Sequence, residues 1–354
     1  MIVDSHVHVA TTDDRYPVAP TGIGTDWWKE PDHDAESFVG AMDQAGVDQA
    51  VLVQAVGPYS FDNRYVVAAS SAHPGRLAAV VAVDLDAADH LAHLEELAVL
   101  PAVTGVRLFG MTTARRWIGR GGASTVLETA ARLGLTAVVT VTADDIAPLR
   151  PAFAAAECPV VLDHCGFPAF EDGRIAPGEP VLGLAELDRI HLKVTTHTFQ
   201  HADGDPAAVV DQLVGLFGPG RLLWGSDHPQ TFGGLGAAVE TARQGVRRLA
   251  VEDQARFLGA TTADLFGLDR GGAELPPGVH DALDPLARSL AADGYRLDVV
   301  AIADGRARLD VRAGEGACDD CLVPKEVFVG IAANRLERAG IELALEVSYP
   351  VDVP

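Results

Sequence analysis

The sequence contains little cysteine, with only four in 354 residues. Two of these, Cys158 and Cys165, stand alone, whereas Cys318 and Cys321 form a single Cys-x-x-Cys pair. Disulfide scaffolds are typical of short secreted chains with several regularly spaced cysteines. We therefore expect no disulfide framework, and the reducing cytoplasm fits this cysteine content.

Basic residues are also scarce. The chain has 27 lysines and arginines against 50 aspartates and glutamates, which gives a formal net charge of −23. Nucleic acids and anionic membrane surfaces are bound through basic patches. The charge balance therefore argues against both as partners, although a few buried Lys or Arg side chains could still hold a small anionic substrate.

Long apolar runs are missing as well. No stretch reaches the roughly 18 consecutive apolar residues of a membrane-spanning helix, and no basic region precedes an apolar one at the N-terminus, as in a signal peptide. The remaining composition, 48% hydrophobic and 22% charged, is typical of soluble globular proteins. Because single cores usually stop growing at about 250–300 residues, we expect two domains.

Strand and helix patterns alternate over the first predicted domain, residues 1–270. Several strands are nearly continuous apolar runs, such as Ala50–Val56, Leu77–Val83 and Ala137–Val141, which is typical of parallel strands buried on both faces. Eight strands with intervening helices over about 250 residues indicate the α/β class and a (β/α)8 TIM barrel. In that fold the chemistry lies at the carboxyl ends of the strands.

Side chains that could perform chemistry gather in or at the ends of the predicted strands. His6 and His8 are two residues apart, so they point to the same face of the first strand. Two such imidazoles could bind a metal ion, or could be hydrogen-bonded histidines at a barrel mouth. The other residues in these positions are Arg107, Asp163, His164, Lys193, His197, Asp227 and His228.

A long loop is expected after the first strand. Residues 10–33 are rich in Pro, Gly, Asp and Thr, and loops of this length are usually functional, often as lids. Trp27 and Trp28 lie within it. We expect them to pack inside the loop rather than to form a platform for substrate.

Three segments resemble the amidohydrolase superfamily. They are Asp-Ser-His-Val-His at 4–8, Val-Leu-Asp-His-Cys-Gly-Phe-Pro at 161–168 and Leu-Leu-Trp-Gly-Ser-Asp-His-Pro at 222–229. The stretch 255–268 is similar to the usual ending of the branch that contains dicarboxylate lactonases, sugar lactonases and metal-dependent decarboxylases. The resemblance covers residues 1 to about 268 and is specific for the family, not for a substrate.

The resemblance implies roles for the matching residues. His6 and His8 would be metal ligands, and His164 a further ligand or a histidine that polarises the substrate. Asp227 would bind the metal and accept a proton from the attacking water. No lysine ends the fourth strand and no histidine ends the fifth, so we expect one divalent ion, zinc or manganese, rather than two. Some similar lactonases work without metal.

Other residues could hold or orient the substrate. Arg107 and Lys193 could fix an anionic group, because a guanidinium binds a carboxylate in a fork geometry. Alternatively, Lys193 could be a buried ion-pair partner, and Arg107 could simply bridge the end of the barrel. His197 is a further candidate for substrate binding, and Asp163 is expected to orient His164. The expected reaction is hydrolysis of a small cyclic ester such as a lactone. Non-oxidative decarboxylation of a small carboxylic acid is the alternative.

The rest of the chain predicts a second, α+β domain at 279–354, after a Pro- and Gly-rich linker at 271–278. Its predicted order is helix, β-hairpin, Cys-x-x-Cys, helix and strand, which resembles the NifU-like iron–sulfur scaffold domain. The resemblance implies that Cys318 and Cys321 hold an iron–sulfur cluster, which a second chain could complete in a homodimer. Structural or inert thiols are the alternative. A third function class is an iron–sulfur or metal-handling protein with a non-catalytic barrel.

Overall fold

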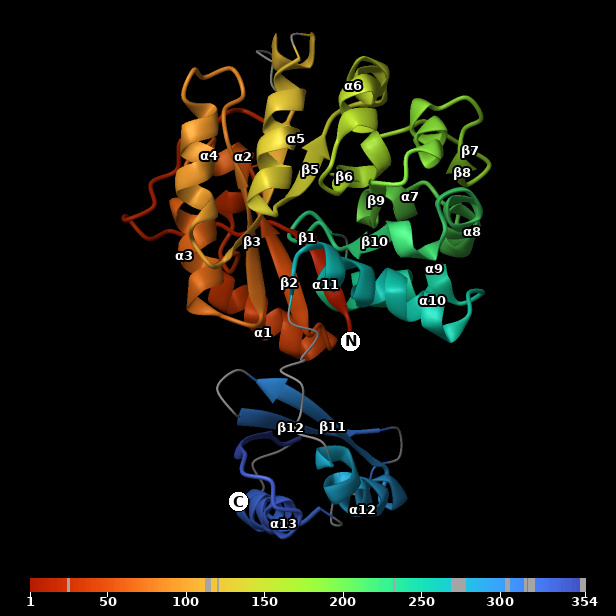
Figure 1. The fold of residues 1–354 in the computed structure, drawn as a ribbon. Helices are drawn as coiled ribbons and strands as arrows, with labels where there is room; N and C mark the ends of the chain where they lie inside the picture. Colours follow the sequence, from red (N-terminus) through yellow and green to blue (C-terminus); the bar gives the residue numbers. More distant parts are fainter. Residues whose placement is uncertain are drawn as a thin grey trace. The chain divides into compact units, whose positions relative to one another are not determined.

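The computed structural model divides the chain into two compact units, Met1–Leu268 and Asp269–Pro354 (Figure 1). Apart from Gly278, the predicted linker lies outside the residues that the structure describes. Cys318 and Cys321 lie outside them as well. The described residues are 1–23, 26–111, 116–119, 121–231, 233–268, 278–302, 306–314, 317 and 322–350.

The first unit is built on eight parallel strands, which are hydrogen-bonded in chain order. They are β1 (Val3–Val7), β2 (Gln49–Val53), β3 (Leu77–Ala82), β4 (Val103–Phe109), β5 (Thr136–Thr140), β6 (Val160–Leu162), β9 (Ile190–Thr195) and β10 (Leu222–Gly225). A parallel bridge between Val7 and His228 connects the two edges of the sheet. The sheet is therefore a nearly closed barrel, which confirms the predicted α/β class.

Helices cover the outside of this barrel (Figure 1). The longer ones are α1 (Ala35–Ala45), α3 (Arg64–Ala72), α4 (His90–Ala98), α5 (Gly122–Leu133), α6 (Ala143–Ala155), α8 (Pro206–Phe217) and α9 (Gly234–Val246). The shorter ones are α2 (Val56–Tyr59), α7 (Thr196–Gln200), α10 (Val251–Ala255) and α11 (Thr261–Leu265). Local signals set their ends: the Asp34 carboxylate accepts from the Ser37 amide to cap α1, and Gly46 ends it with φ 70°, as expected for a left-handed C-cap.

Alternation along the strands separates two sets of buried side chains. In β2, Ala50 and Leu52 belong to the large cluster that packs against the helices, whereas Val51 and Val53 belong to a smaller one. Because successive side chains point to opposite faces, the smaller cluster fills the barrel interior, where Phe266 joins it. The same alternation turns the polar side chains of the strands inward: His6, Arg107, Thr140, Asp163 and Lys193.

Three features of the first unit were not indicated by the sequence. Helix α6 is continuous although it contains both Pro148 and Pro151. Each proline removes one backbone donor, and tertiary packing of Leu149 and Phe153 holds the helix despite that loss. Helix α7 and the hairpin of β7 (Phe170–Glu171) and β8 (Arg174–Ile175) are too short to give a periodic signal in sequence.

The second unit has the predicted order of elements. Helix α12 (Val279–Ala292) precedes the hairpin of β11 (Tyr295–Ile302) and β12 (Arg306–Ala313), and α13 (Lys325–Arg338) precedes β13 (Ala344–Ser348). Strand β12 pairs antiparallel with β11 and parallel with β13. Its core joins the two helices to the sheet through Leu283, Leu286, Leu290, Leu309, Phe328, Ala332 and Leu336. Within the described residues, no helix is long and apolar enough to cross a membrane.

Candidate metal centre at the barrel mouth

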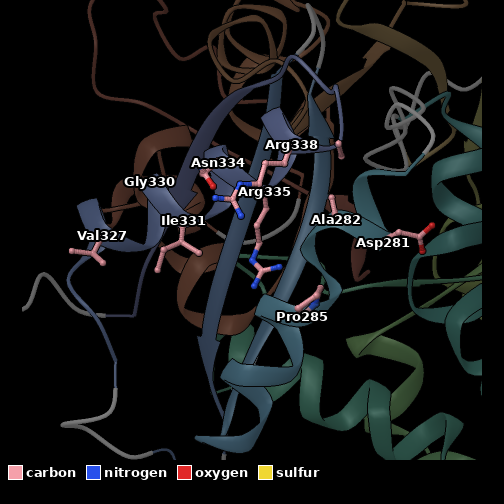
Figure 2. A pocket seen from close by; sticks show the side chains of 10 residues that line it. Asp281, Ala282, Pro285, Val327, Gly330, Ile331, Asn334, Arg335 and Arg338 are labelled. Carbon is pink, nitrogen blue, oxygen red and sulfur yellow. The ribbon is translucent and has the colours of Figure 1, made fainter.

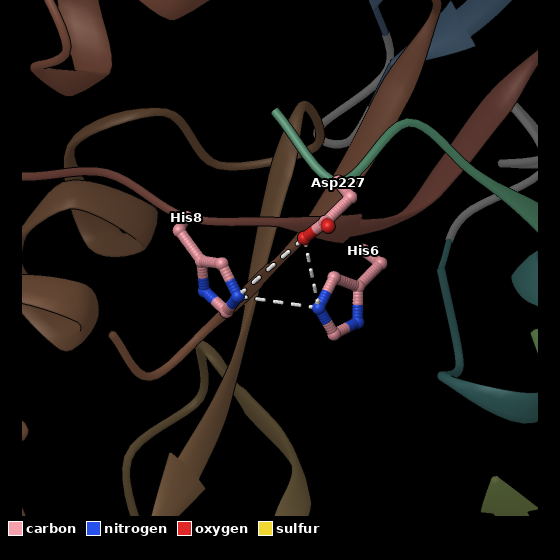
Figure 3. Close-up of side chains that lie close together, drawn as sticks. All are labelled: His6, His8 and Asp227. Atoms are coloured by element: carbon pink, nitrogen blue, oxygen red, sulfur yellow. Dashed lines mark hydrogen bonds and ion pairs between the residues drawn. The ribbon is translucent and has the colours of Figure 1, made fainter. Parts of the chain in front are cut away.

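Three side chains from the two edges of the sheet converge at the end of the barrel (Figure 3). His6 lies in β1, His8 follows that strand, and Asp227 follows β10. The Nε2 atoms of the two histidines are 3.2 Å apart, and Asp227 Oδ1 lies 3.6 Å from that of His6 and 3.9 Å from that of His8. All three residues are buried. The predicted pair of imidazoles and the carboxylate of the last strand are thus brought together.

The free lone pairs of these three side chains are suited to binding a divalent cation. His8 Nδ1 lies 2.8 Å from the Val53 carbonyl oxygen, which only accepts, so His8 Nε2 bears a lone pair. The Asp163 carboxylate and the Lys193 ammonium both lie 3.1 Å from His6 Nδ1, so the Nε2 atom of His6 is the one that faces His8 and Asp227. Asp227 Oδ1 is buried and has no hydrogen-bond partner among the described residues. Ligand atoms about 2.0 Å from a tetrahedral ion lie roughly 3.3 Å apart, which is close to the observed spacing.

A buried carboxylate, Asp163, supports His6 from the inside of the barrel. Its Oδ2 accepts hydrogen bonds from Thr140 Oγ1 at 2.6 Å and Arg107 Nη2 at 3.2 Å. Its Oδ1 lies 3.0 Å from Lys193 Nζ and 3.1 Å from His6 Nδ1. Burial opposes ionisation of Asp163, but His6, Lys193 and Arg107 outweigh it and hold the pKa of its carboxyl well below the ordinary value. The group is therefore a carboxylate that orients a ligand histidine, as is common beside metals.

The two cations predicted to hold substrate face this carboxylate. Arg107 is 4% exposed and also donates to Thr140 Oγ1 at 2.8 Å and to the Gln54 carbonyl at 3.0 Å. Lys193 is fully buried, and its Nζ also lies 3.1 Å from His6 Nδ1. Both therefore form internal ion pairs with Asp163, which for Lys193 is the alternative that the sequence left open. Contact of either one with substrate stays a prediction.

His164 lies beside the three converging residues without joining them. Its ring centroid is 4.8 Å from that of His6, and its Nδ1 is 2.8 Å from Thr195 Oγ1. Thr195, rather than Asp163, is thus the hydrogen-bond partner that orients His164, which corrects the sequence interpretation. His164 is not part of the ligand group of His6, His8 and Asp227, so its predicted ligand role stays a prediction.

Burial sets the protonation of the site. It lowers the pKa of both His8 and His164 to about 3, with positive charges nearby acting in the same direction. These imidazoles are therefore neutral at physiological pH and can act as ligands or hydrogen-bond partners. Burial, together with the Asp163 carboxylate, raises the pKa of Asp227 to about 8. A buried carboxyl with such a pKa can exchange a proton near neutral pH.

The backbone around the site requires particular residues. A Cβ at Gly225 would lie 2.8 Å from His6 Cβ, so the glycine of the Trp-Gly-Ser-Asp motif leaves room for the side chain of His6. Asp4 Oδ1 accepts from the amides of Ser226 at 2.8 Å and His6 at 3.1 Å and so connects β1 to the end of β10. His164 and Asp227 both have positive φ, 53° and 61°, conformations that usually persist at functional sites.

Aromatic and histidine side chains surround the three converging residues. Trp27 is half-buried, and its ring stacks over His8 with centroids 6.4 Å apart and planes at 21°. Trp28 is buried and belongs to the main core cluster of the first unit. His197 is half-buried, with its ring 6.0 Å from His164 and 5.0 Å from Phe167. Of the two adjacent tryptophans, only Trp27 faces the site.

Sequence reasoning missed several supporting residues. Thr140 was visible at the end of the fifth strand, but its bond to Asp163 depends on the spacing between strands. Thr195, Asp4 and the Gln54 carbonyl act through contacts across the barrel, and no motif signals such contacts. The inward alternation of Thr140, Asp163 and Thr195 along their strands is the one signal that could have identified them.

Comparisons with known proteins agree with this geometry. The amidohydrolase family (Amidohydro_2) matches residues 3–268. An L-fucono-1,5-lactonase from Burkholderia ambifaria is 27% identical over 76% of this chain and 96% of its own. A candidate 2-pyrone-4,6-dicarboxylic acid hydrolase from Pseudomonas putida is 26% identical, with a TM-score of 0.57 over 76% of this chain and 98% of its own. An amidohydrolase from Burkholderia multivorans, crystallised with zinc, shares the fold at 18% identity, with a TM-score of 0.60 over 76% of this chain and 99% of its own.

Proposed function

The chain belongs to the amidohydrolase family, and from this premise we propose that its first unit is a metal-dependent hydrolase of a small, anionic cyclic ester. The observation that carries the proposal is the buried convergence of His6, His8 and Asp227, with one carboxylate oxygen unpartnered among the described residues. The names of the relatives support the bond type, because a fuconolactone and a pyrone are both cyclic esters. The dicarboxylic acid in the second name supports a negative charge on the substrate.

The proposed roles follow from the positions of the side chains. His6, His8 and Asp227 would hold one ion, zinc or manganese, which would polarise the ester carbonyl and acidify water. Asp227 takes the proton of the water that attacks the carbonyl carbon. As the ring C–O bond breaks, Asp227 returns this proton to the leaving oxygen, and the product is an open-chain hydroxy acid. Without the ion, burial raises the pKa of Asp227 to about 8; a bound cation would lower it again and keep the group a carboxylate that can accept the proton.

The neighbouring residues position the substrate and the ligands. We assign His164 and His197 to substrate contact, because both lie at the mouth and the Nδ1 of His164 is already bonded to Thr195. We assign Lys193 and Arg107 to holding Asp163 and, through it, His6. A substrate carboxylate could still approach this positive network from the mouth, which is the role that the sequence suggested.

The experiment is an assay of acid release from sugar lactones and from pyrone dicarboxylate, with metal analysis of the purified chain. We expect acid release without carbon dioxide and about one divalent ion per chain. Carbon dioxide evolution would instead favour the decarboxylase alternative. Asp227→Asn should reduce kcat by at least about a hundredfold without unfolding the chain. The matched control is Asp188→Asn, at an exposed site before β9, and full activity of Asp227→Asn would contradict the proposed role.

For the second unit we propose a NifU-like scaffold with Cys318 and Cys321 as iron ligands. Its order of helices and strands supports this proposal. Iron and sulfide should be found in the full chain after anaerobic reconstitution and lost in the double variant Cys318→Ser, Cys321→Ser. Their absence from the wild type would contradict it. Iron and sulfide at the cysteines with no metal at the histidines would favour the metal-handling alternative for the whole protein.

A further inference from the structure

An indole ring lies over one of the three converging side chains. The ring of Trp27 stacks on that of His8, with centroids 6.4 Å apart and planes at 21°. Trp27 is half-buried, so part of its surface remains accessible. His8 is already oriented by the Val53 carbonyl oxygen, which lies 2.8 Å from its Nδ1. The stacked indole is therefore not needed to hold this histidine, and its position calls for another explanation.

The loop that carries Trp27 is attached to the barrel, so the indole has a fixed place. The Ala10 amide donates to the His33 carbonyl at 2.8 Å and joins the two ends of the loop. Further along, the Thr21 amide donates to the Gly57 carbonyl of α2 at 2.9 Å. A contact surface that is positioned in advance costs little conformational entropy when a ligand binds.

Trp28 anchors the turn in which Trp27 lies. Both belong to the short 3-10 turn Trp27–Lys29. Trp28 is 8% exposed, and a Cβ added at Gly57 would lie 3.2 Å from its ring. The rings of Trp28 and His33 each meet Trp27 edge to face, with centroids 6.0 and 5.7 Å away. Core packing therefore accounts for Trp28, whereas the rings around Trp27 hold its plane nearly parallel to that of His8.

The two histidines of the pair have different neighbours. Trp27 stacks on His8, whereas His164 lies beside His6 with ring centroids 4.8 Å apart. The neighbour of His8 is thus an apolar indole face, and the neighbour of His6 is an imidazole that forms hydrogen bonds. A substrate in contact with both would turn its C–H bonds to the indole and its oxygen atoms to His164.

We propose that Trp27 determines substrate specificity, because the ring of the cyclic ester stacks on its indole while the ester carbonyl faces the three converging residues. This inference rests on the proposed function and defines the substrate class more closely. It requires a ring with one face free of hydroxyl groups, as in a planar pyrone or in a sugar lactone whose C–H bonds gather on one side. An aromatic side chain binds such a face through its π-system and the apolar area that it buries.

The test compares two substitutions of Trp27 in the zinc-loaded full chain, assayed with a panel of sugar lactones and pyrone dicarboxylate. Trp27→Leu removes the aromatic face, and we expect kcat/KM to fall about 10–100-fold. Most of the loss should appear in KM, because stacking holds the ground state and the transition state alike. Trp27→Phe keeps an aromatic face and should lose less than about fivefold. The panel member with the largest loss shows which ring Trp27 binds.

A matched control removes apolar surface from a different cavity. Ile331 is 39% exposed and lines the groove between α12 and α13 of the second unit (Figure 2), and Ile331→Ala should leave kcat/KM unchanged. The zinc affinity and the melting temperature of Trp27→Leu should equal those of the wild type. A decrease in either would mean that Trp27 supports His8 or the loop instead, and would overturn the proposal.

The same assay separates the failure of this inference from the failure of the proposed function. A lactone that the wild type and Trp27→Leu hydrolyse with equal kcat/KM contradicts the role of Trp27 alone, as do equal losses in Trp27→Leu and Trp27→Phe. If the zinc-loaded wild type hydrolyses no member of the panel, the proposed function is contradicted, and the role of Trp27 falls with it.

Discussion

Among single residues, Asp163 is where contacts from four strands meet. It bonds or pairs with Thr140 of β5, Arg107 of β4, Lys193 of β9 and His6 of β1. These partners hold the Asp163 carboxylate in place beside the imidazole of His6, and so they fix the position of that ring. The geometry of the candidate metal centre should therefore depend on the charges of Asp163, Arg107 and Lys193, which would not contact the ion.

Replacement of Lys193 tests that dependence. Lys193→Met keeps the volume of the side chain but removes the charge facing Asp163 Oδ1, so we expect a loss of about 3–5 kcal/mol in the free energy of unfolding. We also expect about 10–100-fold weaker zinc binding, because His6 is oriented less firmly. Competition with a chromophoric chelator measures the affinity. Lys325→Met, at an exposed position, is the control, and unchanged zinc affinity in Lys193→Met would refute the positioning role.

Gly225 offers a second test at this scale. In Gly225→Ala the new methyl group would lie 2.8 Å from His6 Cβ, so the ligand must move by several tenths of an ångström. We expect weaker metal binding, by about tenfold or more, and reduced kcat. Gly215→Ala, on the exposed side of α8 with no atom within 4 Å of the new Cβ, should instead be neutral or stabilise by up to about 1 kcal/mol. Equal effects of the two changes on metal affinity would show that His6 tolerates displacement.

At the scale of elements, the join between β1 and β10 determines whether the site exists. The backbone bridge of Val7 and His228 is isolated, and Asp4 supplements it by accepting from two amides. Asp4→Ala should leave the Ser226 amide unsatisfied and cost roughly 2–4 kcal/mol of unfolding free energy. Asp4→Asn retains an acceptor and should cost less. Urea unfolding monitored by fluorescence measures both, and equal stability of the two variants would show that the bridge holds the join without Asp4.

The elements also show what the sequence could and could not indicate. Apolar runs predicted strands such as β2, β3 and β5, because strands buried on both faces are nearly continuously apolar in sequence. The conformation of the chain after β6 was not predictable, because His164 and Cys165 both adopt positive φ without a glycine to suggest it. In this turn the imidazole of His164 forms its hydrogen bond with Thr195 rather than with Asp163, which is why the assigned orienting residue was wrong.

For the whole molecule, barrel closure decides the chemistry. Motifs identified His6, His8 and Asp227 individually, yet 222 positions separate Asp4 from Ser226, which it contacts. Only the closed order of eight strands brings such distant segments together. The inward direction of the site's side chains could be predicted from the alternation along each strand. The convergence of Arg107 and Lys193 on Asp163 could not, because it depends on how far neighbouring strands are shifted along the barrel. These shifts between strands arise from the packing of the whole barrel, and no local sequence pattern indicates them.

A metal ion bound between residues of β1 and Asp227, which follows β10, should make the stability of the first unit depend on that ion. An ion that binds the folded barrel and not the unfolded chain stabilises it by about 2.7 kcal/mol at a free concentration 100 times the dissociation constant. Calorimetry of the full chain should therefore show the transition of the first unit rising with added zinc and falling with chelator. In Asp227→Asn this dependence should be lost or greatly reduced, whereas Asp188→Asn should retain it. A wild-type transition that ignores both zinc and chelator would mean that these three side chains converge for a reason other than metal binding.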